Sequence, residues 1–504
     1  MNRPDIIIFN PDQWRGDVVG HLGNPAVHTP VLDDLVDKDA VSFRHAFVQA
    51  TVCTPSRCSF MTGWYPHVRG HRTMHHMLNP NFDEPNLLKV LRDNGYFVWW
   101  GGKNDMVPGQ LGYGDHCDQK FRPTRADYER WGVEPSEGSH GGNLAWRGDP
   151  QGDNFFSFYK GKLSREDGGK YFDGDWAMVY GAIDFLRSYD GDQPLCLFLP
   201  IGYPHPPYCV EEPWFSITDR DAIPRRHEYT RWDDKPSLLK GIRDGQRLTK
   251  WSESRWQELR GTYYGMCSRV DHQFGLVLDA LKQANRYDEA AVFLFSDHGD
   301  FTGDYGLVEK TQNTFQDCLA NVPFIVKPPA KVQAVQGVRD QLVELVDFAA
   351  TVYDLANIEC GYWHFGQSLV PLFRDPKMAH RDVVFTEGGR LRGESQASER
   401  ESMAANTSLG LYAPRVSLQV EEADRLKHTK ATMCRTRNFK YVRRAYELDE
   451  FYDLRNDPGE TCNEIVNPNY AEALREHQDL MLQWYMQTCD VVPMQTDQRN
   501  FSHA

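Results

Sequence analysis

Short apolar runs alternate along the chain with longer stretches whose apolar residues recur at helical spacing. Five runs have the length and composition of buried strands: 6–10, 96–100, 195–201, 291–295 and 322–326. Three stretches have the spacing of amphipathic helices: 29–37, 86–93 and 256–283. Strands that alternate with helices form a parallel sheet covered on both faces. We therefore predict an α/β fold with a large, mostly parallel sheet sandwiched by helices.

The pattern changes after about residue 375. Residues 391–428 are polar and weakly periodic, which predicts a long excursion that covers a site or contacts another subunit. Short strand-like runs follow to residue 454 and predict a small antiparallel sheet, and a helix is expected at 471–486. We therefore divide the chain into a main domain, 1–375, and a smaller C-terminal α+β subdomain, 376–504.

Side chains that can titrate or bind a ligand follow four of the predicted strands. In parallel sheets, ligands bind beyond the C-terminal ends of the strands. A single strand followed by such residues means little, because loops are usually polar. Four strands followed by them predict one shared site. These residues are Asp12 and Gln13, Lys103 and Asp105, His205, and Asp297 and His298.

Composition limits the class of partner. The 504 residues carry a net charge of −15, which argues against nucleic acid or an anionic membrane as the main partner. No window reaches the ~18 apolar residues of a membrane span. The first apolar run, 6–9, is too short for the core of a signal peptide, and the cysteines are scattered and odd in number. These features predict a cytoplasmic protein with reduced thiols.

The stretch "VCTPSRCSFMTG" at 52–63 places two cysteines, Cys53 and Cys58, close together. A zinc site needs a second ligand pair at suitable spacing, which the chain lacks. A redox pair usually has two residues between the cysteines rather than four. A phosphatase-type loop would place its arginine later and include glycines. None of these three interpretations fits.

The same stretch resembles the signature of the type I sulfatases, C-x-P-S-R followed by T-G, in which the cysteine is oxidised to formylglycine. Further segments resemble that family in order between residues 5 and 464: "DIIIFNPDQWRGD", "GYFVWWGGKND", "GYPHPPY", "FSDHGDFTGDYGLVEK" and "FYDLRNDPGETCN". The resemblance implies the fold of the alkaline phosphatase superfamily, with Cys53 as the modified position and Cys58 as a packing residue.

The resemblance also implies a mechanism. The hydrated aldehyde at position 53 attacks sulfur, and loss of a proton from its second hydroxyl expels sulfate. Arg57 would orient the nucleophile, Lys103 and Lys310 would hold sulfate oxygens, and His205 would protonate the leaving oxygen. Many family members carry histidine where this chain has Asp105, so a carboxylate would serve there as the base or contact the substrate.

A divalent metal is implied as well. Its ligands would be Asp12, Gln13, Asp297, His298 and an oxygen of modified Cys53. The family uses calcium, and oxygen-rich sites favour such hard cations. Gln13 replaces the commoner second aspartate and His298 offers nitrogen, so Mn²⁺ and Mg²⁺ also remain open.

The segment "HVRGHRTMHHM" at 67–77 concentrates histidines and arginines after the signature. Its candidate substrate contacts are His71, Arg72, His75 and His76, and a solvated loop with surface histidines is an equal alternative.

Three functions stay open at this stage. The first is a sulfatase that acts on a small sulfated substrate, a carbohydrate sulfate or an aryl sulfate. The second is a phosphonate monoester or phosphodiester hydrolase of the same superfamily. The third is a non-catalytic binding protein on the same fold. An enzyme would need a maturation partner for Cys53, either a formylglycine-generating enzyme or an anaerobic sulfatase-maturating enzyme, and a homo-oligomer is possible.

Overall fold

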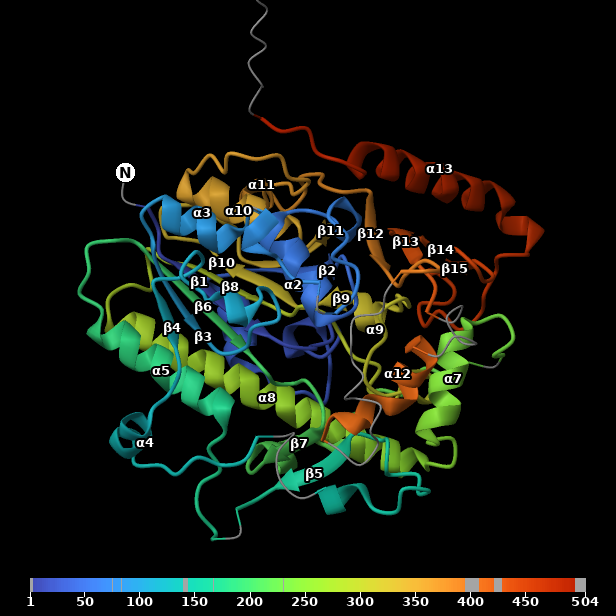
Figure 1. Cartoon of the computed structure of the whole chain (residues 1–504), viewed down its shortest axis with the longest axis horizontal. Coiled ribbons are helices and arrows are strands. Elements are labelled where there is room, and N and C mark those ends of the chain that lie inside the picture. Colours follow the sequence, from blue (N-terminus) through green and yellow to red (C-terminus); the bar gives the residue numbers. More distant parts are fainter. Residues whose placement is uncertain are drawn as a thin grey trace, which may run out of the picture.

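The computed structural model describes residues 3–494 except 75, 83, 139–143, 166, 230, 395–407 and 421–427. Its main body is a nine-stranded sheet with helices on both faces (Figure 1). Along the sheet the strands run in the order β11-β2-β10-β8-β1-β6-β3-β4, with β9 paired to β2. The predicted fold class is confirmed.

The predicted runs form the centre of this sheet. They correspond to β1 (Ile6–Pro11), β3 (Phe97–Gly101), β6 (Leu195–Ile201), β8 (Ala291–Phe295) and β10 (Phe324–Lys327). β1 pairs in parallel with β6 and β8, and β3 pairs in parallel with β6. Along β1, Ile6 and Ile8 face one hydrophobic core while Ile7 and Phe9 face the other. Burial on both faces explains the continuous apolar run.

The edges of the sheet differ from the sequence prediction. Pro323 lacks an N–H group and divides the expected strand 322–326 into β9 (Asn321–Val322) and β10, which runs antiparallel to β8. Three further strands were missed: β2 (Val41–Phe47), β4 (Gln119–Phe121) and β11 (Gly337–Glu344). β2 and β11 carry charged residues within their runs, which hides their strand pattern.

Two sets of helices cover the sheet. One face packs against α1 (Pro30–Lys38), α5 (Gly174–Ser188) and α8 (Glu253–Gln283). The other packs against α2 (Cys53–Thr62), α3 (Leu87–Asp93), α10 (Asp347–Ala356) and α11 (Val370–Arg374). The other α-helices and strands described before residue 375 are α4 (Arg125–Trp131), β5 (Tyr159–Leu163), β7 (Tyr208–Glu211), α6 (Trp214–Ile217), α7 (Ser237–Gln246) and α9 (Asp317–Ala320).

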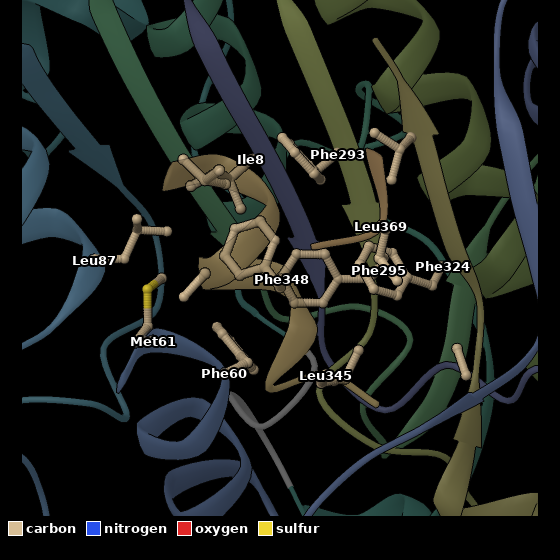
Figure 2. Close-up of a cluster of buried hydrophobic side chains, with 14 of the residues drawn as sticks. Ile8, Phe60, Met61, Leu87, Phe293, Phe295, Phe324, Leu345, Phe348 and Leu369 are labelled. Carbon is tan, nitrogen blue, oxygen red and sulfur yellow. The ribbon is translucent and has the colours of Figure 1, made fainter. Parts of the chain in front are cut away.

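An aromatic cluster fixes α2 against the sheet (Figure 2). The ring of Phe60, on α2, lies 5.0 Å from that of Phe295 on β8 and 6.0 Å from that of Phe348 on α10. Phe348 also contacts Phe293, with ring centroids 5.1 Å apart. Because α2 begins at Cys53, this cluster determines where that residue lies relative to the strand ends.

The C-terminal part forms the predicted antiparallel sheet. Its order is β12 (Val383–Gly388), β13 (Ala431–Thr436), β14 (Phe439–Arg444) and β15 (Glu450–Asp453), and α13 (Ala471–Thr488) follows. The backbone N–H of Glu387 donates to the Gln49 carbonyl at 2.9 Å and links this sheet to the main body. In the described residues, no helix is long and apolar enough to cross a membrane.

The polar excursion at 391–428 is partly helical. Its described residues include α12 (Ala413–Val420), a helix that was not predicted within this excursion. Leu411 and Val416 are buried in the core that α8 helps to form. Pro414 lies close to Gly245 on α7, where an added Cβ would be 2.9 Å from the proline Cβ. Packing on α7 therefore stabilises a helix that the weak sequence pattern did not indicate.

The aromatic cluster yields a stability prediction. Phe348→Ala should lower the free energy of unfolding by about 3–5 kcal/mol, because it leaves a cavity among packed rings. The measurement is urea denaturation followed by circular dichroism. Phe82, whose side chain is 72% exposed, gives the matched control, and Phe82→Ala should change stability by less than ~0.5 kcal/mol. Equal effects of the two variants would contradict this account of the core.

Candidate active site

The parallel central strands bring distant loops to one edge of the sheet. Phe9 of β1 is in register with Leu199 of β6 and Leu294 of β8, and Trp100 of β3 is in register with Phe198. The four C-terminal strand ends therefore meet, as do the loops that follow them. The sequence-predicted residues in these loops gather around one buried group of polar atoms.

The loop after β1 is tightly held. Gln13 has a φ of 70°, a left-handed conformation that non-glycine residues rarely adopt. Its backbone N–H donates to Oδ1 of Asp297 at 3.1 Å, and its carbonyl accepts from the Tyr263 hydroxyl at 2.7 Å. The next amide, of Trp14, donates to the Ser296 hydroxyl at 2.8 Å. Such strain persists where surrounding contacts hold it, and it is frequent at functional sites.

Cys53 is the first residue of α2, a helix in which every residue is buried. Its Sγ lies 3.2 Å from Nε2 of His298, 3.6 Å from Oδ1 of Asp12 and 3.8 Å from Nζ of Lys103. Burial raises the pKa of the Cys53 thiol, and the negative charge of Asp12 adds to the effect. The unmodified thiol is therefore a poor nucleophile, which argues against a thiolate mechanism.

Buried charges surround this cysteine. The Arg57 guanidinium lies 2.8 Å from Oδ2 of Asp297 and 3.3 Å from Oδ2 of Asp12, and it donates to Asn10 at 2.7 Å. Lys103 forms ion pairs with Asp12 and, at 2.9 Å, with Asp105. Burial raises the pKa of Asp12, but the charges of Lys103 and other nearby cations outweigh burial and hold that pKa well below its usual value. Asp12 is therefore ionised at neutral pH.

Four residues of this cluster could hold a metal ion. One ligand atom from each of Asp12, Cys53, Asp297 and His298 lies within 4.8 Å of the others. Burial lowers the pKa of His298, which keeps its imidazole neutral and able to bind a cation. Two carboxylates, a neutral imidazole and an oxygen placed at position 53 would suit a divalent ion. The residues present therefore fit the metal that the sequence implied.

Gln13 and Lys310 form a second set of contacts at the loop after β1. Nζ of Lys310 donates to Oε1 of Gln13 at 2.6 Å, and Nε2 of Gln13 donates to Oδ2 of Asp300 at 2.5 Å. Lys310 also forms an ion pair with Glu309 at 3.2 Å. The Gln13 amide thus connects the lysine to Asp300, and its oxygen, the expected metal ligand, contacts Lys310 here.

His205 lies in the turn that follows β6. Its Nδ1 donates to the Pro206 carbonyl at 2.7 Å, because a carbonyl can only accept. Both carboxylate oxygens of Asp175 accept backbone amides of this turn, from Gly202 and Tyr203, at 2.8 Å each. His205 and Lys103 line one cavity of about 260 Å³, so both reach the same space.

The histidine-rich segment has its own set of contacts. His71 contacts the His76 carbonyl at 2.8 Å and the Glu84 carboxylate at 2.9 Å, while Arg72 forms an ion pair with Glu394 at 2.5 Å. His71 and His76 line a second cavity of about 480 Å³, which Asn104 also lines. His75 lies outside the described residues. The role of this segment as a substrate contact stays a prediction.

Sequence reasoning missed residues that complete the site. Asn10 accepts from Arg57, and its place in "FNPDQ" could have identified it. Tyr412 and Arg415 come from the polar excursion. The Tyr412 ring lies 6.5 Å from that of His205, and Nε of Arg415 lies 3.6 Å from Oε2 of Glu309. No local sequence signal marks these two, because only packing of α12 brings them here.

Known proteins resemble this chain over most of its length. The profile of the Sulfatase family matches residues 4–358. The multifunctional alkaline phosphatase superfamily protein PehA of Trinickia caryophylli is 23% identical over 97% of this chain and 96% of its own. The ulvan-active sulfatase of Formosa agariphila is 25% identical over 95% of this chain and 80% of its own.

A solved structure shows the same fold. The phosphonate monoester hydrolase of Agrobacterium radiobacter is 20% identical, covers 96% of both chains and superposes with a TM-score of 0.73. The similarity between this structure and our chain is one of fold. The family profile, in contrast, covers the segments that carry Asp12, Cys53, Lys103, His205 and Lys310. This chain belongs to the sulfatase family of the alkaline phosphatase superfamily and is a sulfuric ester hydrolase.

Proposed function

We propose that this enzyme hydrolyses the sulfate ester of a small carbohydrate at Cys53 after oxidation of that residue to formylglycine. The observation that carries the proposal is the position of Cys53 Sγ, buried at the start of α2 and within 4 Å of Asp12, Lys103 and His298. In hydrated form, the aldehyde supplies the nucleophilic oxygen. A divalent ion bound by Asp12, Asp297, His298 and position 53, with Gln13 as a further candidate ligand, would neutralise charge on the sulfate.

The cations near Cys53 have separate tasks. Lys103, 3.8 Å from the sulfur, is positioned to bind a sulfate oxygen, and Lys310, which donates to Gln13, would bind another. Arg57 holds both Asp12 and Asp297 and so orients the groups around position 53. Nδ1 of His205 donates to the Pro206 carbonyl, which fixes the ring, and His205 in its imidazolium form would donate a proton to the leaving oxygen.

Asp105 is our candidate for the base that removes the last proton before sulfate leaves. Its carboxylate lies 2.9 Å from Nζ of Lys103, near the reacting centre. Burial raises the pKa of Asp105, but the charges of Lys103 and Arg57 lower it by more than burial raises it. The pKa therefore lies below its usual value. Asp105 is thus ionised at neutral pH and able to accept a proton.

The cavity beside Lys103 and His205 supports a polar alcohol as the leaving group. Two carboxylates, three glycines and the ring of Tyr203 line it, so hydroxyl groups of a sugar would find acceptors beside a flat apolar surface. The similarity to the ulvan-active sulfatase also supports a carbohydrate substrate. All eleven cysteines are free, which is consistent with a reducing cytoplasm and with small imported substrates. Maturation of Cys53 would then require a formylglycine-generating or anaerobic sulfatase-maturating enzyme.

Phosphonate monoester hydrolysis is the second candidate. Gln13 in place of a second acid and the fold similarity to the Agrobacterium radiobacter hydrolase favour it. Lys103 and Lys310, two cations around position 53, favour a sulfate ester instead.

The first prediction concerns Cys53 and the reaction class. Mass spectrometry of the active enzyme should show that the peptide containing Cys53 has the lower mass expected when the thiol is replaced by an aldehyde. 4-Nitrophenyl sulfate should be hydrolysed faster than 4-nitrophenyl phenylphosphonate in parallel assays. Cys53→Ala should abolish both activities, whereas Cys58→Ala should retain them because Cys58 only packs in the core. Faster turnover of the phosphonate would make the second candidate the function.

The second prediction concerns Asp105. Asp105→Asn should lower kcat on 4-nitrophenyl sulfate by more than roughly tenfold, because the amide cannot accept the proton. Asp115→Asn, at an exposed position, is the matched control and should leave kcat unchanged. A near-normal rate in Asp105→Asn would remove this residue from the mechanism.

The third prediction concerns the metal. Removal of divalent ions by a chelator should lower the Tm measured by calorimetry, because an ion that binds only the folded state stabilises it by ~2.7 kcal/mol at 100 times its Kd. Separate addition of Ca²⁺, Mn²⁺ and Mg²⁺ will rank the ions by the recovery of Tm. Asp297→Asn should lose most of this response while Asp115→Asn keeps it. An unchanged Tm together with no bound metal by elemental analysis would exclude the site.

A further inference from the structure

The cavity next to the reacting centre has an acidic wall that the chemistry described above does not use. Asp173 and Asp175 form this wall, and Lys103, His205 and Tyr203 line the same cavity. Gly138, Gly174 and Gly202 also line it and contribute no side chains. We call this cavity the acidic pocket. Its volume of about 260 Å³ is below the ~300–1,000 Å³ typical of pockets for drug-sized ligands, so it suits one small ring or branched alcohol.

The two acidic side chains come from the N-terminus of α5. Asp173 is the N-cap, where its carboxylate accepts from the Trp176 amide at 3.2 Å. Asp175 follows in the first turn and accepts the amides of Gly202 and Tyr203. The helix dipole favours carboxylates at this end. The wall is therefore a fixed part of the fold, and each Asp175 oxygen retains a lone pair for a ligand.

The charges of this wall are unevenly balanced. Arg269 lies 2.5 Å from Asp173 and 3.2 Å from Glu211, so one guanidinium serves two carboxylates. In the described part of the chain, no cation lies within ion-pair distance of Asp175. Burial and the nearby Asp173 raise the pKa of Asp175 to about 6, although the charge of Arg269 and the amides of Gly202 and Tyr203 act in the opposite direction. Lys103 is already paired with Asp12 and Asp105.

We propose that the acidic pocket holds the alcohol part of the substrate and that Asp175 binds an ammonium group on it. The preferred substrate is then the sulfate ester of an amino alcohol, such as an amino sugar. The inference rests on the proposed sulfatase function and specifies its substrate class. A cation would balance the unpaired carboxylate, a neutral hydroxyl would make only a hydrogen bond, and an anionic alcohol would be repelled.

Two matched substrate pairs test the charge preference with the wild-type, matured enzyme. The pairs are 2-aminoethyl sulfate with 2-hydroxyethyl sulfate, and glucosamine 6-sulfate with glucose 6-sulfate. In at least one pair, the amine should have a kcat/KM roughly tenfold higher or more, the ratio expected when a charged hydrogen bond replaces a neutral one. Equal or reversed ratios in both pairs would overturn the inference.

4-Nitrophenyl sulfate separates the two levels of the proposal. Hydrolysis of this ester without hydrolysis of any of the four alcohol sulfates would reject the acidic pocket and leave the sulfatase function intact. If enzyme with a verified aldehyde at position 53 fails on all five esters, the proposed function itself is wrong.

Two variants test the pocket directly. Asp175→Asn removes the charge and keeps an oxygen acceptor for one backbone amide, so the amine-to-hydroxyl ratio of kcat/KM should fall toward one. If that variant does not fold, Gly174→Leu provides the test, since an added Cβ there has no atom within 4 Å. It should lower kcat/KM for glucosamine 6-sulfate relative to 2-aminoethyl sulfate by roughly tenfold, because a leucine of that size excludes a ring.

The control for Gly174→Leu is Gly114→Leu, at another glycine with no atom within 4 Å of an added Cβ and outside the acidic pocket. Gly114→Leu should keep the wild-type ratio between the two substrates. An unchanged ratio in Gly174→Leu would show that the alcohol binds elsewhere and would overturn the inference.

Discussion

A single guanidinium makes the site possible. Asp12 and Asp297 have no exposed surface, and burial of two carboxylates so close together is costly without a counter-charge. Arg57, itself 2% exposed, contacts both of them and Asn10. These contacts join the loop after β1, the loop after β8 and the helix that carries Cys53. The rest of the catalytic arrangement depends on this connection, because it sets the position of each group around the cysteine.

The main body supports that connection from below. β1, β6, β8 and β3 end at one edge of the sheet, and the aromatic cluster of Phe60, Phe295 and Phe348 fixes α2 above it. Closely packed cores resist even small displacements of a helix. A rigid framework thus holds a charged, partly strained site, and Gln13 with its left-handed backbone shows where the strain lies.

Charge also organises the space around the reaction. Cations gather where a sulfate would bind, with Nζ of Lys103 3.8 Å from Cys53 Sγ and Nζ of Lys310 2.6 Å from Gln13 Oε1. Carboxylates at the N-terminus of α5 line the adjoining cavity. An ester with an anionic and a cationic end matches this separation of charge. Recognition of the sulfate and of the alcohol would therefore use different parts of the chain.

The sequence by itself determined the α/β class, the central strands and the chemistry of the strand ends. Buried strands need continuous apolar runs, and the segments around Cys53, Lys103 and Lys310 have distinctive local patterns. Only the tertiary structure decided the edges, where β2 and β11 carry charged residues that hide their pattern. It also decided which distant groups meet: Tyr412 and Arg415 near His205 and Glu309, and Asp175 beneath the His205 turn. Those contacts join residues more than a hundred positions apart or depend on packing of α12 and α5, and no local pattern encodes such proximity.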